Sequence, residues 1–486
     1  MAAAAFIDLD RTLLSGASGP VITASLRAAR LVPQSFPGES LIYRIFNTVG
    51  ETLPSMLLAR QGATAMKGKS QRLVRDAARN AIPELTTLVQ PFARQMIDKH
   101  RAAGDKLVLA TTTPYDFIEE FARSLGFDDV IGTRFEVDAG GLYTGELDGR
   151  FVWSGGKLAA VSDWCSSNGM NVADCAAYTD SIYDSPLLEA VGSPHVVNPD
   201  ARLQVLAAAR RWPILNLDVS PGVVKVPVIG TELQKLALTF ARPELIPFAK
   251  FTIDGTHNIP ADGPAILVGN HRSYFDVFAV SLTVAKTGRT VRFLGKKEVF
   301  DAPVIGQLAA ALGGIRVDRG TGSDAPLDAA AAALEAGEMV AIMPQGTIPR
   351  GRAFFDPALQ GRWGAARLAM RTGAPVIPMG LWGTEKVWPR NSQVPMLWNV
   401  TNPPKVSVTV GPEVALRRDA SSDALASAAD ALADDNTKRM MSAIINLLPP
   451  EAREPREPTE AELRAALPSN YKGDLNAEFT RRPGTD

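Results

Sequence analysis

Short apolar runs that end in polar clusters recur through the first 220 residues, and a helical pattern follows each of them. The runs ending at Ile7, Ala110 and Thr179 are patterns of buried strands, because they are continuous, short and bounded by polar residues. Strands that alternate with helices of these lengths predict an α/β fold with a doubly wound parallel sheet. The predicted helices cover residues 24–31, 40–49, 70–81, 115–125 and 158–166, and a hairpin is predicted at 132–149.

The alternation of strands and helices returns after a connector that contains prolines and glycines. Within this connector, residues 233–242 have apolar positions at helical spacing, with basic residues at the edges. Such a helix lies in a membrane interface in some proteins and packs on its own domain in others, and the pattern leaves both interpretations open. Strand patterns at 265–268, 291–294 and 339–343 then predict a second α/β domain.

These patterns divide the chain into three regions. Residues 1–218 form one predicted domain, with a helical insert at about 15–95, and residues 219–450 contain the connector and the second domain. The last region, residues 451–486, carries prolines among charged residues and is predicted to lie on the surface or to be partly disordered. The length of 486 residues agrees with this division, because it exceeds what one hydrophobic core usually organises.

The composition indicates the cellular compartment of the protein and excludes some classes of binding partner. A formal net charge of −1 argues against a general nucleic-acid-binding protein. The two cysteines, Cys165 and Cys175, predict a reducing compartment with no disulfide framework and no cysteine-based metal site. The N-terminus lacks the basic start of a signal peptide, and no run reaches the ~18 apolar residues of a membrane-spanning helix. We therefore expect a cytoplasmic protein.

Two aspartates with one residue between them follow the first predicted strand. Alternate residues at a strand end point the same way, so Asp8 and Asp10 are expected to converge on one site. Clustered carboxylates repel one another unless a cation joins them, and Mg²⁺ prefers oxygen ligands. An aspartate beside Mg²⁺ is able to attack a phosphoryl group while a second one protonates the leaving oxygen. The alternative is a polar turn after a strand, which this pair alone leaves open.

Polar residues also follow the other predicted strands of this region. Thr111-Thr112-Thr113 ends a strand before a helix, a position that suits a phosphate. Lys157 opens a later helix, and Asp180 and Asp184 follow the next strand. In this order the residues resemble the motifs of the haloacid-dehalogenase-type phosphatases, in the branch that includes phosphoserine phosphatases, and the resemblance covers about residues 4–218.

This resemblance implies a phosphatase with a helical cap, a Mg²⁺ cofactor and a phosphomonoester substrate. The residue roles that it implies are Asp8 as nucleophile, Asp10 as acid and base, Thr111 as the phosphoryl-binding hydroxyl, Lys157 as the neutralising cation, Asp8, Asp10 and Asp180 at the metal, and Asp184 in support of Asp180.

A second candidate site lies where a predicted strand passes into a helix. A histidine takes a proton from a hydroxyl when a carboxylate holds its ring and stabilises the imidazolium, and His271 precedes Asp276 by five positions. Residues five apart on one ideal helix point about 140° apart, so the two meet only if His271 lies in the loop or the first turn. The alternative is a capping box, with Ser273 as N-cap and Asp276 three positions later.

Later segments complete an order that resembles the glycerol-phosphate and lysophosphatidate acyltransferases over about residues 245–415. They are Gly313 to Arg319, Pro344-Gln345-Gly346-Thr347 and Val376-Ile377-Pro378. The roles that the resemblance implies are His271 as general base, Asp276 as the group that orients it, Arg319 at the acceptor phosphate, Gln345, Gly346 and Thr347 around the acceptor, and residues 376–378 on the acyl side.

One residue departs from the acyltransferase pattern. The family usually has Glu where this chain has Gln345. An amide keeps hydrogen-bonding capacity and loses the charge. The departure leaves the predicted fold unchanged and puts the identity of the acceptor in question.

Together the two resemblances imply a fused enzyme. One domain would use acyl-CoA to convert 1-acyl-glycerol-3-phosphate, a lysophospholipid, to phosphatidate, and the other would be a Mg²⁺-dependent phosphatase. Because the product and the acyl donor partition into bilayers, we expect peripheral association with the inner face of the membrane. The alternatives are an acyltransferase for another lysolipid or alcohol with a regulatory or structural first domain, and a membrane-recruited scaffold that binds lipid headgroups without turnover. The phosphatase substrate, the acyl chain, coupling of the two activities and a homodimeric state stay open.

Overall fold

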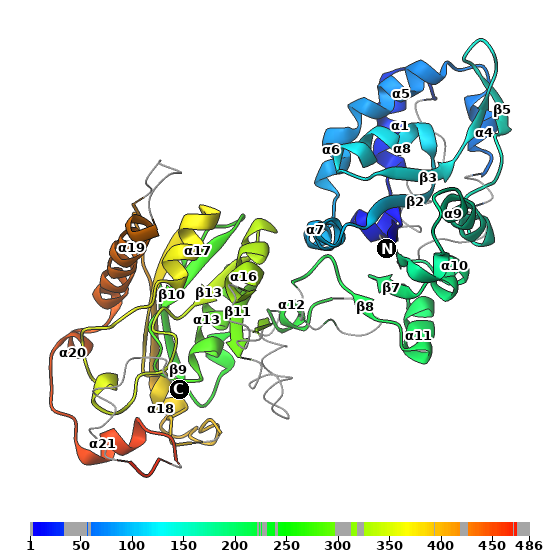
Figure 1. Ribbon diagram of the computed structural model, residues 1–486. Helices are drawn as coiled ribbons and strands as arrows, with labels where there is room; N and C mark the ends of the chain where they lie inside the picture. The colour runs from blue at the N-terminus through cyan, green and yellow to red at the C-terminus, as the bar shows by residue number, and fades with distance from the viewer. Residues whose placement is uncertain are drawn as a thin grey trace. The chain divides into compact units, whose positions relative to one another are not determined.

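The chain folds into two compact units, Met1–Pro221 and Gly222–Asp486. Figure 1 shows that each unit contains its own sheet and its own covering helices. The computed structural model describes residues 3–33, 56, 60–220, 223, 225, 231–238, 242–296, 313–317, 325–392, 394–417, 426–469 and 471–473. The predicted helix at 40–49 and the predicted phosphate ligand Arg319 lie outside these residues.

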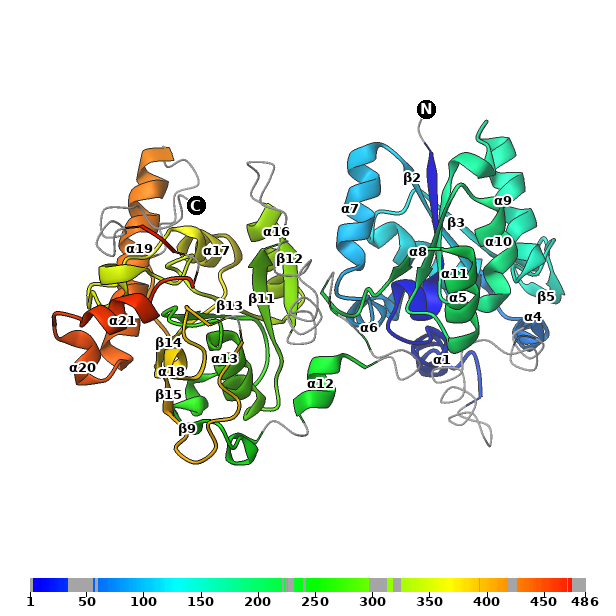
Figure 2. The same ribbon diagram turned by 90° about the horizontal axis from the view of Figure 1, so that it is seen from below.

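The first unit is built on a six-stranded parallel sheet in the order β3-β2-β1-β6-β7-β8. Its strands are β1 (Ala4–Ile7), β2 (Lys106–Pro114), β3 (Asp129–Thr133), β6 (Ala176–Thr179), β7 (Ser193–Val197) and β8 (Ile214–Leu215). Three helices pack on one face of it through a shared apolar cluster: α9 (Gly155–Ser167), α10 (Ser185–Ala190) and α11 (Ala201–Arg210). Figure 2 shows α7 (Ala93–Ala103) on the opposite side, and α8 (Tyr115–Ser124) follows β2.

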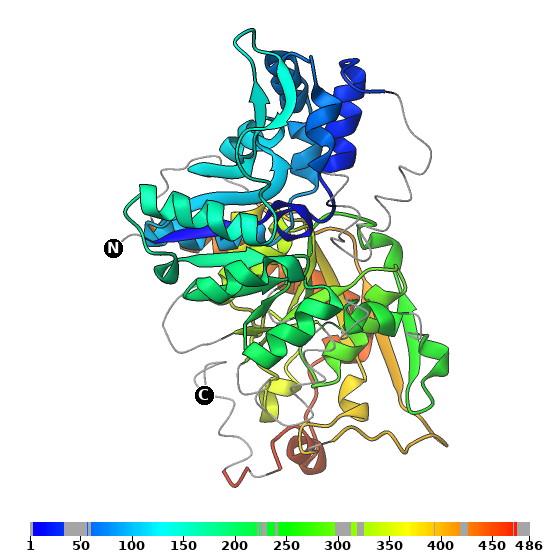
Figure 3. The same ribbon diagram turned by 90° about the vertical axis from the view of Figure 1, so that its right-hand side faces the viewer.

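A helical cap is inserted in the sequence between β1 and β2, which are neighbours in the sheet. Its described helices are α1 (Gly19–Ala28), α4 (Gly62–Met66), α5 (Gln71–Asn80) and α6 (Ile82–Thr87). The predicted hairpin is present as β4 (Phe135–Val137) and β5 (Tyr143–Leu147), and it joins the cap where the Gly68 N–H donates to the Tyr143 carbonyl at 2.8 Å. Asp116 on α8 accepts hydrogen bonds from Arg75 and Tyr143 and so fastens the cap and hairpin to the sheet domain. Figure 3 shows these elements, in blue and cyan, grouped at one side of the first sheet.

The second unit has a seven-stranded mixed sheet in the order β12-β11-β13-β10-β14-β15-β9. Five strands run parallel, whereas β15 is antiparallel to β14 and parallel to β9. The strands are β9 (Lys250–Asp254), β10 (Ala265–Gly269), β11 (Val291–Lys296), β12 (Gly314–Val317), β13 (Met339–Ile342), β14 (Val376–Trp382) and β15 (Lys405–Val410). The α/β class predicted for both parts of the chain is confirmed.

Side-chain alternation along β10 divides the second core into two layers. Ile266 and Val268 pack with α16 (Ala325–Glu335), α17 (Gly364–Thr372) and α19 (Ala426–Leu447), whereas Ala265 and Leu267 pack with α13 (Asp276–Ala285). Successive strand residues point to opposite faces, so one continuous apolar run supplies both layers. Figure 2 shows α16, α17 and α19 on one side of the sheet and α13 on the other.

The described part of the connector packs on the second unit. Arg292 of β11 is buried and pairs with Glu232 at 2.7 Å, and Gln234 of α12 (Leu233–Leu238) donates to the Val291 carbonyl at 3.2 Å. The start of this helix therefore packs on its own domain, and residues 239–241 lie outside the described part of the chain. Within the described residues, no helix is long and apolar enough to cross a membrane.

The described part of the tail after α19, residues 448–469 and 471–473, is more regular than its composition predicts. It contains α20 (Pro450–Arg453) and α21 (Glu460–Ala465). Thr459 and Glu462 form a capping box at the start of α21, and Leu463 and Leu467, four residues apart, are buried. A capping box and one apolar stripe are enough to order a short helix against a domain, and the frequent prolines obscured both signals.

Candidate active sites

Asp8 and Asp180 follow neighbouring strands of the first sheet. Strands β1 and β6 are neighbours in the middle of the sheet, with β2 and β3 beyond β1 and with β7 and β8 beyond β6, so the strand order reverses between them. At this reversal the N–H of Asp8 donates to the Tyr178 carbonyl at 2.9 Å. Ligands of open α/β sheets bind in the crevice outside the carboxyl ends of the strands at such a reversal. Thr111, near the end of β2, belongs to the same edge.

Lys157 is a buried cation between two carboxylates. Its Nζ lies 2.9 Å from Oδ1 of Asp8 and 2.6 Å from Oδ2 of Asp184. A buried charge is tolerated when it is paired and hydrogen-bonded. The first turn of α9 approaches the chain closely because residue 156 is glycine, where a Cβ would lie 2.2 Å from the Phe151 carbonyl oxygen. The glycine thus allows the helix start to bring Lys157 to Asp8.

The turn after β1 directs its own arginine and threonine toward Asp180. Arg11 Nε lies 3.2 Å from Oδ2 of Asp180, and the Thr12 hydroxyl donates to Oδ1 at 3.3 Å. The Asp180 N–H donates back to Thr12 at 2.9 Å. Arg11 has a φ of 59°, a left-handed conformation that is uncommon for residues other than glycine. This turn therefore surrounds Asp180 with a cation and a hydroxyl.

Asp10 faces a different set of partners. Its Oδ1 accepts from the main-chain N–H of Ser18, and its Oδ2 accepts from the Thr113 hydroxyl at 3.3 Å. Desolvation raises the pKa of Asp10 above the ordinary value of 3.8, and the hydrogen bonds from Ser18 and Thr113 offset part of that rise. A raised pKa favours the protonated form of a carboxyl group, and that is the form that donates a proton in acid catalysis.

The threonines at the end of β2 contribute differently. Thr111 is buried, and its hydroxyl accepts from the Thr113 N–H at 3.1 Å. The Thr112 hydroxyl is buried and has no hydrogen-bond partner in the described part of the chain. Buried polar atoms are nearly always paired. Thr112 is thus a second candidate for contact with a phosphoryl oxygen, which the sequence alone did not distinguish from its neighbours.

The chemistry of this edge fits a hard divalent cation. Asp8 and Asp180 supply carboxylate oxygens, and Oδ1 of Asp184 is buried with no hydrogen-bond partner among the residues described. Among all the residues that the structure describes, no group of three His, Cys, Asp or Glu side chains is placed so that it could hold a metal ion by itself. Mg²⁺ commonly takes one or two carboxylates and completes its shell with water and substrate oxygens. The donors present therefore match Mg²⁺.

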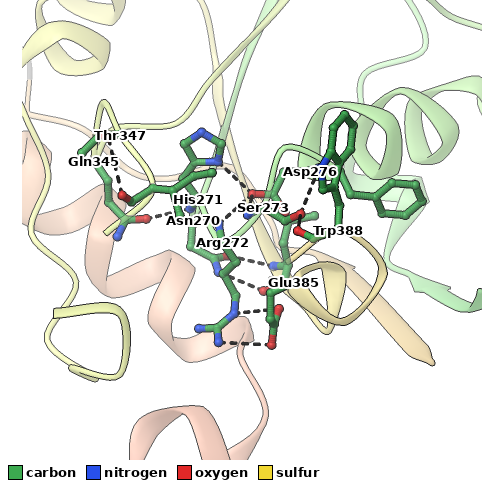
Figure 4. A network of polar contacts seen from close by, with 12 residues as sticks. Asn270, His271, Arg272, Ser273, Asp276, Gln345, Thr347, Glu385 and Trp388 are labelled. Carbon is green, nitrogen blue, oxygen red and sulfur yellow. Dashed lines mark hydrogen bonds and ion pairs between the residues drawn. The ribbon is translucent and has the colours of Figure 1, made fainter. Parts of the chain in front are cut away.

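The second site forms at the carboxyl ends of β10, β13 and β14. His271 lies in the loop after β10, and its Nδ1 is 2.8 Å from Oδ2 of Asp276, the first residue of α13. The same oxygen accepts the N–H groups of Arg272 and Ser273 at 2.7 and 2.8 Å. Figure 4 shows the other ring nitrogen of His271 directed away from this network. The arrangement holds Nε2 ready to accept a proton.

Both interpretations of the His271 segment are represented in part. Asp276 accepts the N–H of Ser273, which is half of a capping box. The Ser273 hydroxyl does not complete the box, because it accepts from Phe275 N–H at 3.0 Å and donates to the Trp388 carbonyl at 2.7 Å. The carboxylate of Asp276 thus organises the turn and holds the imidazole at once.

The turn after β13 reaches the histidine through Gln345. Its side-chain oxygen accepts the N–H of His271 at 2.7 Å, and Gln345 is buried. Gly346 has a φ of +72°, and a Cβ there would lie 3.0 Å from Cδ of Arg362. Thr347 is half-buried in the same turn. Gln345, Gly346 and Thr347 therefore lie beside His271, whereas Val376 and Ile377 are core residues of β14.

Several residues that the sequence did not single out support this site. Arg272 pairs with Glu385 of α18 (Thr384–Val387) at 3.1 Å, and its guanidinium lies 4.3 and 4.1 Å from the ring centres of Phe354 and Trp382. Asn270 exchanges two hydrogen bonds of 2.8 Å with the main chain of Leu381, which joins the loop after β10 to β14. Only the adjacency of Asn270 and Arg272 to His271 hinted at them.

Comparisons with known proteins agree with this division. Residues 5–189 match the family model of the haloacid dehalogenase-like hydrolases, and residues 250–382 match that of the acyltransferases. The inhibition of morphological differentiation protein of Streptomyces azureus is 31% identical over 216 residues, which are 44% of this chain and 78% of that protein. Phosphoserine phosphatase SerB1 of Mycobacterium tuberculosis is 29% identical over 47% of this chain and 75% of its own.

One similar solved structure concerns the second unit. It is the 1-acyl-sn-glycerophosphate acyltransferase PlsC of Thermotoga maritima, with 23% identity, a TM-score of 0.27, and coverage of 43% of this chain and 76% of that one. By the family models and relatives together, the chain is a fusion of a haloacid dehalogenase-like hydrolase domain with an acyltransferase domain.

Proposed function

We propose that the second unit transfers an acyl group from acyl-CoA to the free hydroxyl of 1-acyl-glycerol-3-phosphate, with His271 as general base. The observation that carries the proposal is the 2.8 Å contact between His271 Nδ1 and Asp276 Oδ2, with Nε2 directed away from it. This contact fixes the tautomer that leaves Nε2 as an acceptor, and it stabilises the imidazolium once the proton has moved.

The reaction then needs no covalent acyl-enzyme. His271 removes the proton of the acceptor hydroxyl, and the oxygen attacks the thioester carbonyl. The carbon–sulfur bond breaks, and the imidazolium returns the proton to the departing thiolate of coenzyme A. Gln345 supports this step by holding the main chain of His271, so the ring keeps its position while its charge changes.

The test is thiol release from oleoyl-CoA by the purified full chain in the presence of lysophosphatidate. We expect release that requires the acceptor and is lost in His271→Ala, because general-base catalysis contributes about 10²–10⁴-fold. A matched control is His257→Ala, which removes an exposed histidine of the same unit. Thiol release that occurs only with another lysolipid or alcohol would show that this molecule, and not lysophosphatidate, is the acceptor. No release with any acceptor would favour a headgroup-binding scaffold.

For the first unit, we propose hydrolysis of a phosphomonoester with Asp8 as nucleophile. The carboxylate of Asp8 attacks phosphorus, Asp10 donates a proton to the leaving oxygen, and Asp10 then takes a proton from the water that hydrolyses the acyl phosphate. Lys157 neutralises charge between Asp8 and the phosphoryl group. Mg²⁺, held by Asp8 and Asp180, would withdraw charge from the phosphoryl oxygens.

The phosphatase proposal is tested with p-nitrophenyl phosphate and added Mg²⁺. We expect Asp8→Asn to abolish hydrolysis and to leave acyl transfer unchanged. Asp98→Asn, an exposed change in the same unit, serves as its control. Hydrolysis that survives in Asp8→Asn would instead assign the first unit a regulatory or structural role.

We further propose that the protein works at the inner face of the membrane as a peripheral protein. The support is chemical, because the acyl donor and the lipid product both partition into bilayers.

A further inference from the structure

Exposed apolar side chains gather in one loop of the second unit. Val394, Leu397, Trp398 and Val400 are 55%, 49%, 69% and 52% exposed. The other exposed large apolar side chains of the described residues are scattered along the chain. Single exposed apolar residues are normal, whereas a contiguous group marks an interaction site.

This loop lies between α18 and β15, and its described residues, 388–392 and 394–404, have a defined shape. The Met396 N–H donates to the Val387 carbonyl at 2.8 Å, and Lys250 N–H donates to the Pro404 carbonyl at 2.9 Å. Prolines at 389, 395, 403 and 404 restrict the backbone further. Figure 3 shows the loop, in dark yellow, extending beyond the end of the second sheet. Its apolar side chains are therefore presented outward by an ordered backbone.

Positive charge accompanies the apolar side chains. No acidic residue occurs between Glu385 and Glu413, whereas Lys386 and Lys405 lie in that interval and are exposed. Lys250 faces Lys405 in the register of β9 and β15 and is also exposed. Basic side chains beside exposed Trp and Leu fit an anionic lipid surface. Two copies of this loop would bring like charges together, so self-association is disfavoured.

The loop is fastened at its base to both parts of the acyltransferase site. The Trp388 carbonyl accepts the Ser273 hydroxyl at 2.7 Å, as Figure 4 shows, and the Trp388 ring lies 5.6 Å from that of Tyr274, which is half exposed. Arg390 donates to the carbonyls of Ile348 and Pro349, just after the Gln345 turn. A bilayer bound by the loop would therefore lie beside His271.

We propose that residues 388–392 and 394–404 form a membrane-docking loop, which inserts Leu397 and Trp398 and their apolar neighbours into the surface of a bilayer that contains anionic lipid. The inference rests on the proposed function in one respect, since a lipid acceptor gives docking its purpose. The loop delivers the site to its substrate and leaves the chemistry to His271.

The experiment is flotation of the full chain with phosphatidylcholine vesicles, with and without phosphatidylglycerol. We expect binding that needs phosphatidylglycerol and falls by about tenfold or more in the double variant Leu397→Ser/Trp398→Ser. Val205→Ser is the matched control, because Val205 is 72% exposed on α11 of the other unit. A second measurement is quenching of tryptophan fluorescence by brominated lipid, which should weaken in Trp398→Phe.

Acyl transfer to a monomeric short-chain lysophosphatidate separates docking from chemistry. Vesicle binding lost in the double variant, with this soluble assay unchanged, supports the loop. Binding equal to that of the unaltered chain overturns it, and so does absence of binding to either vesicle. A dimer that the double variant converts to a monomer would show a self-association surface instead. If soluble acyl transfer is absent while the loop still governs vesicle binding, the proposed function fails and the docking inference stands.

Discussion

The two sites stand at equivalent places in their sheets but are built from different interactions. Each follows an interior parallel strand, β1 in the first unit and β10 in the second. The first concentrates full charges, with Lys157 buried between Asp8 and Asp184 and Arg11 on Asp180. In the second, the carboxylate that contacts the histidine, Asp276, is held by neutral groups, because its Oδ2 accepts from an imidazole and two main-chain amides. The Arg272–Glu385 ion pair lies beside them.

This difference follows the charge at the groups that react in each site. A phosphoryl group and a divalent cation bring several charges to the reacting atoms, so a site for them needs opposite charges already in place. The proposed acyl acceptor also carries a phosphate, but the hydroxyl and the thioester that react are neutral, and their reaction moves one proton. We therefore expect changes in the first site to alter stability and activity together, and changes in the second to alter mainly the rate of acyl transfer.

The largest effect is expected from Asp276→Asn. The amide keeps the shape of the carboxylate but cannot stabilise the imidazolium, and it favours the wrong tautomer of His271. By analogy with the corresponding change in Ser-His-Asp hydrolases, kcat for acyl transfer should fall by about 10⁴-fold. Steady-state kinetics measure the loss of rate, and thermal unfolding shows whether stability changes with it. Asp262→Asn, an exposed change in the same unit, is the control. A rate within a few-fold of the unaltered chain would remove Asp276 from the mechanism.

Lys157→Met tests the charged site in the same way. Removal of the cation leaves Asp8 and Asp184 buried without their partner, which should cost about 3–5 kcal/mol of unfolding free energy. Denaturant unfolding of the full chain measures it, together with loss of p-nitrophenyl phosphate hydrolysis. Lys106→Met removes an exposed pair with Asp128 and should change stability by at most about 1 kcal/mol. Equal stability of the two variants would contradict the proposed contrast between sites.

Asp10→Asn separates proton donation from nucleophilic attack. Without a proton to donate from this position, the first turnover of an alkyl phosphate should slow by about 10²-fold. The first-turnover release of p-nitrophenol should be affected much less, because that leaving group needs no proton. Later turnovers should slow with both substrates, because Asp10 also activates the hydrolytic water. For the unaltered chain, the alkyl phosphate rate should decline as pH rises through the raised pKa of Asp10, since the acid form is then lost. Equal losses for both substrates in the first turnover would show that Asp10 does not donate the proton.

Residues close together in the sequence could be assigned to a common site, whereas contacts between distant segments could not be predicted. His271 and Asp276 are five residues apart at a strand-to-helix junction, so covalent geometry restricts how they meet. The same reasoning predicted that Asp8 and Asp10 lie together at one strand end, but their carboxylates contact different partners. Their directions depend on the Ser18 amide and on Lys157, which the pattern of neighbouring residues does not encode.

The unpredicted features depend on packing between distant segments. Arg272 and Glu385 are 113 positions apart, and nothing in either neighbourhood identifies the other as its partner. The sequence does not distinguish the proposed docking loop, because its apolar residues and prolines are typical of an ordinary surface connection. Only exposure in the folded chain distinguishes Trp398 from a core tryptophan.

The smallest effect is expected from Gln345→Glu, which places a second carboxylate beside His271 and so brings the second site closer in charge to the first. The carboxylate still accepts the N–H of His271, so acyl transfer to lysophosphatidate should stay within about tenfold. Gln345→Ala, which loses the hydrogen bond without adding charge, should lower the rate further, because the main chain of His271 is no longer held. Steady-state kinetics of the two variants measure the difference. If Gln345→Glu instead changes which acceptor is used, the amide selects the acceptor as well as holding the histidine.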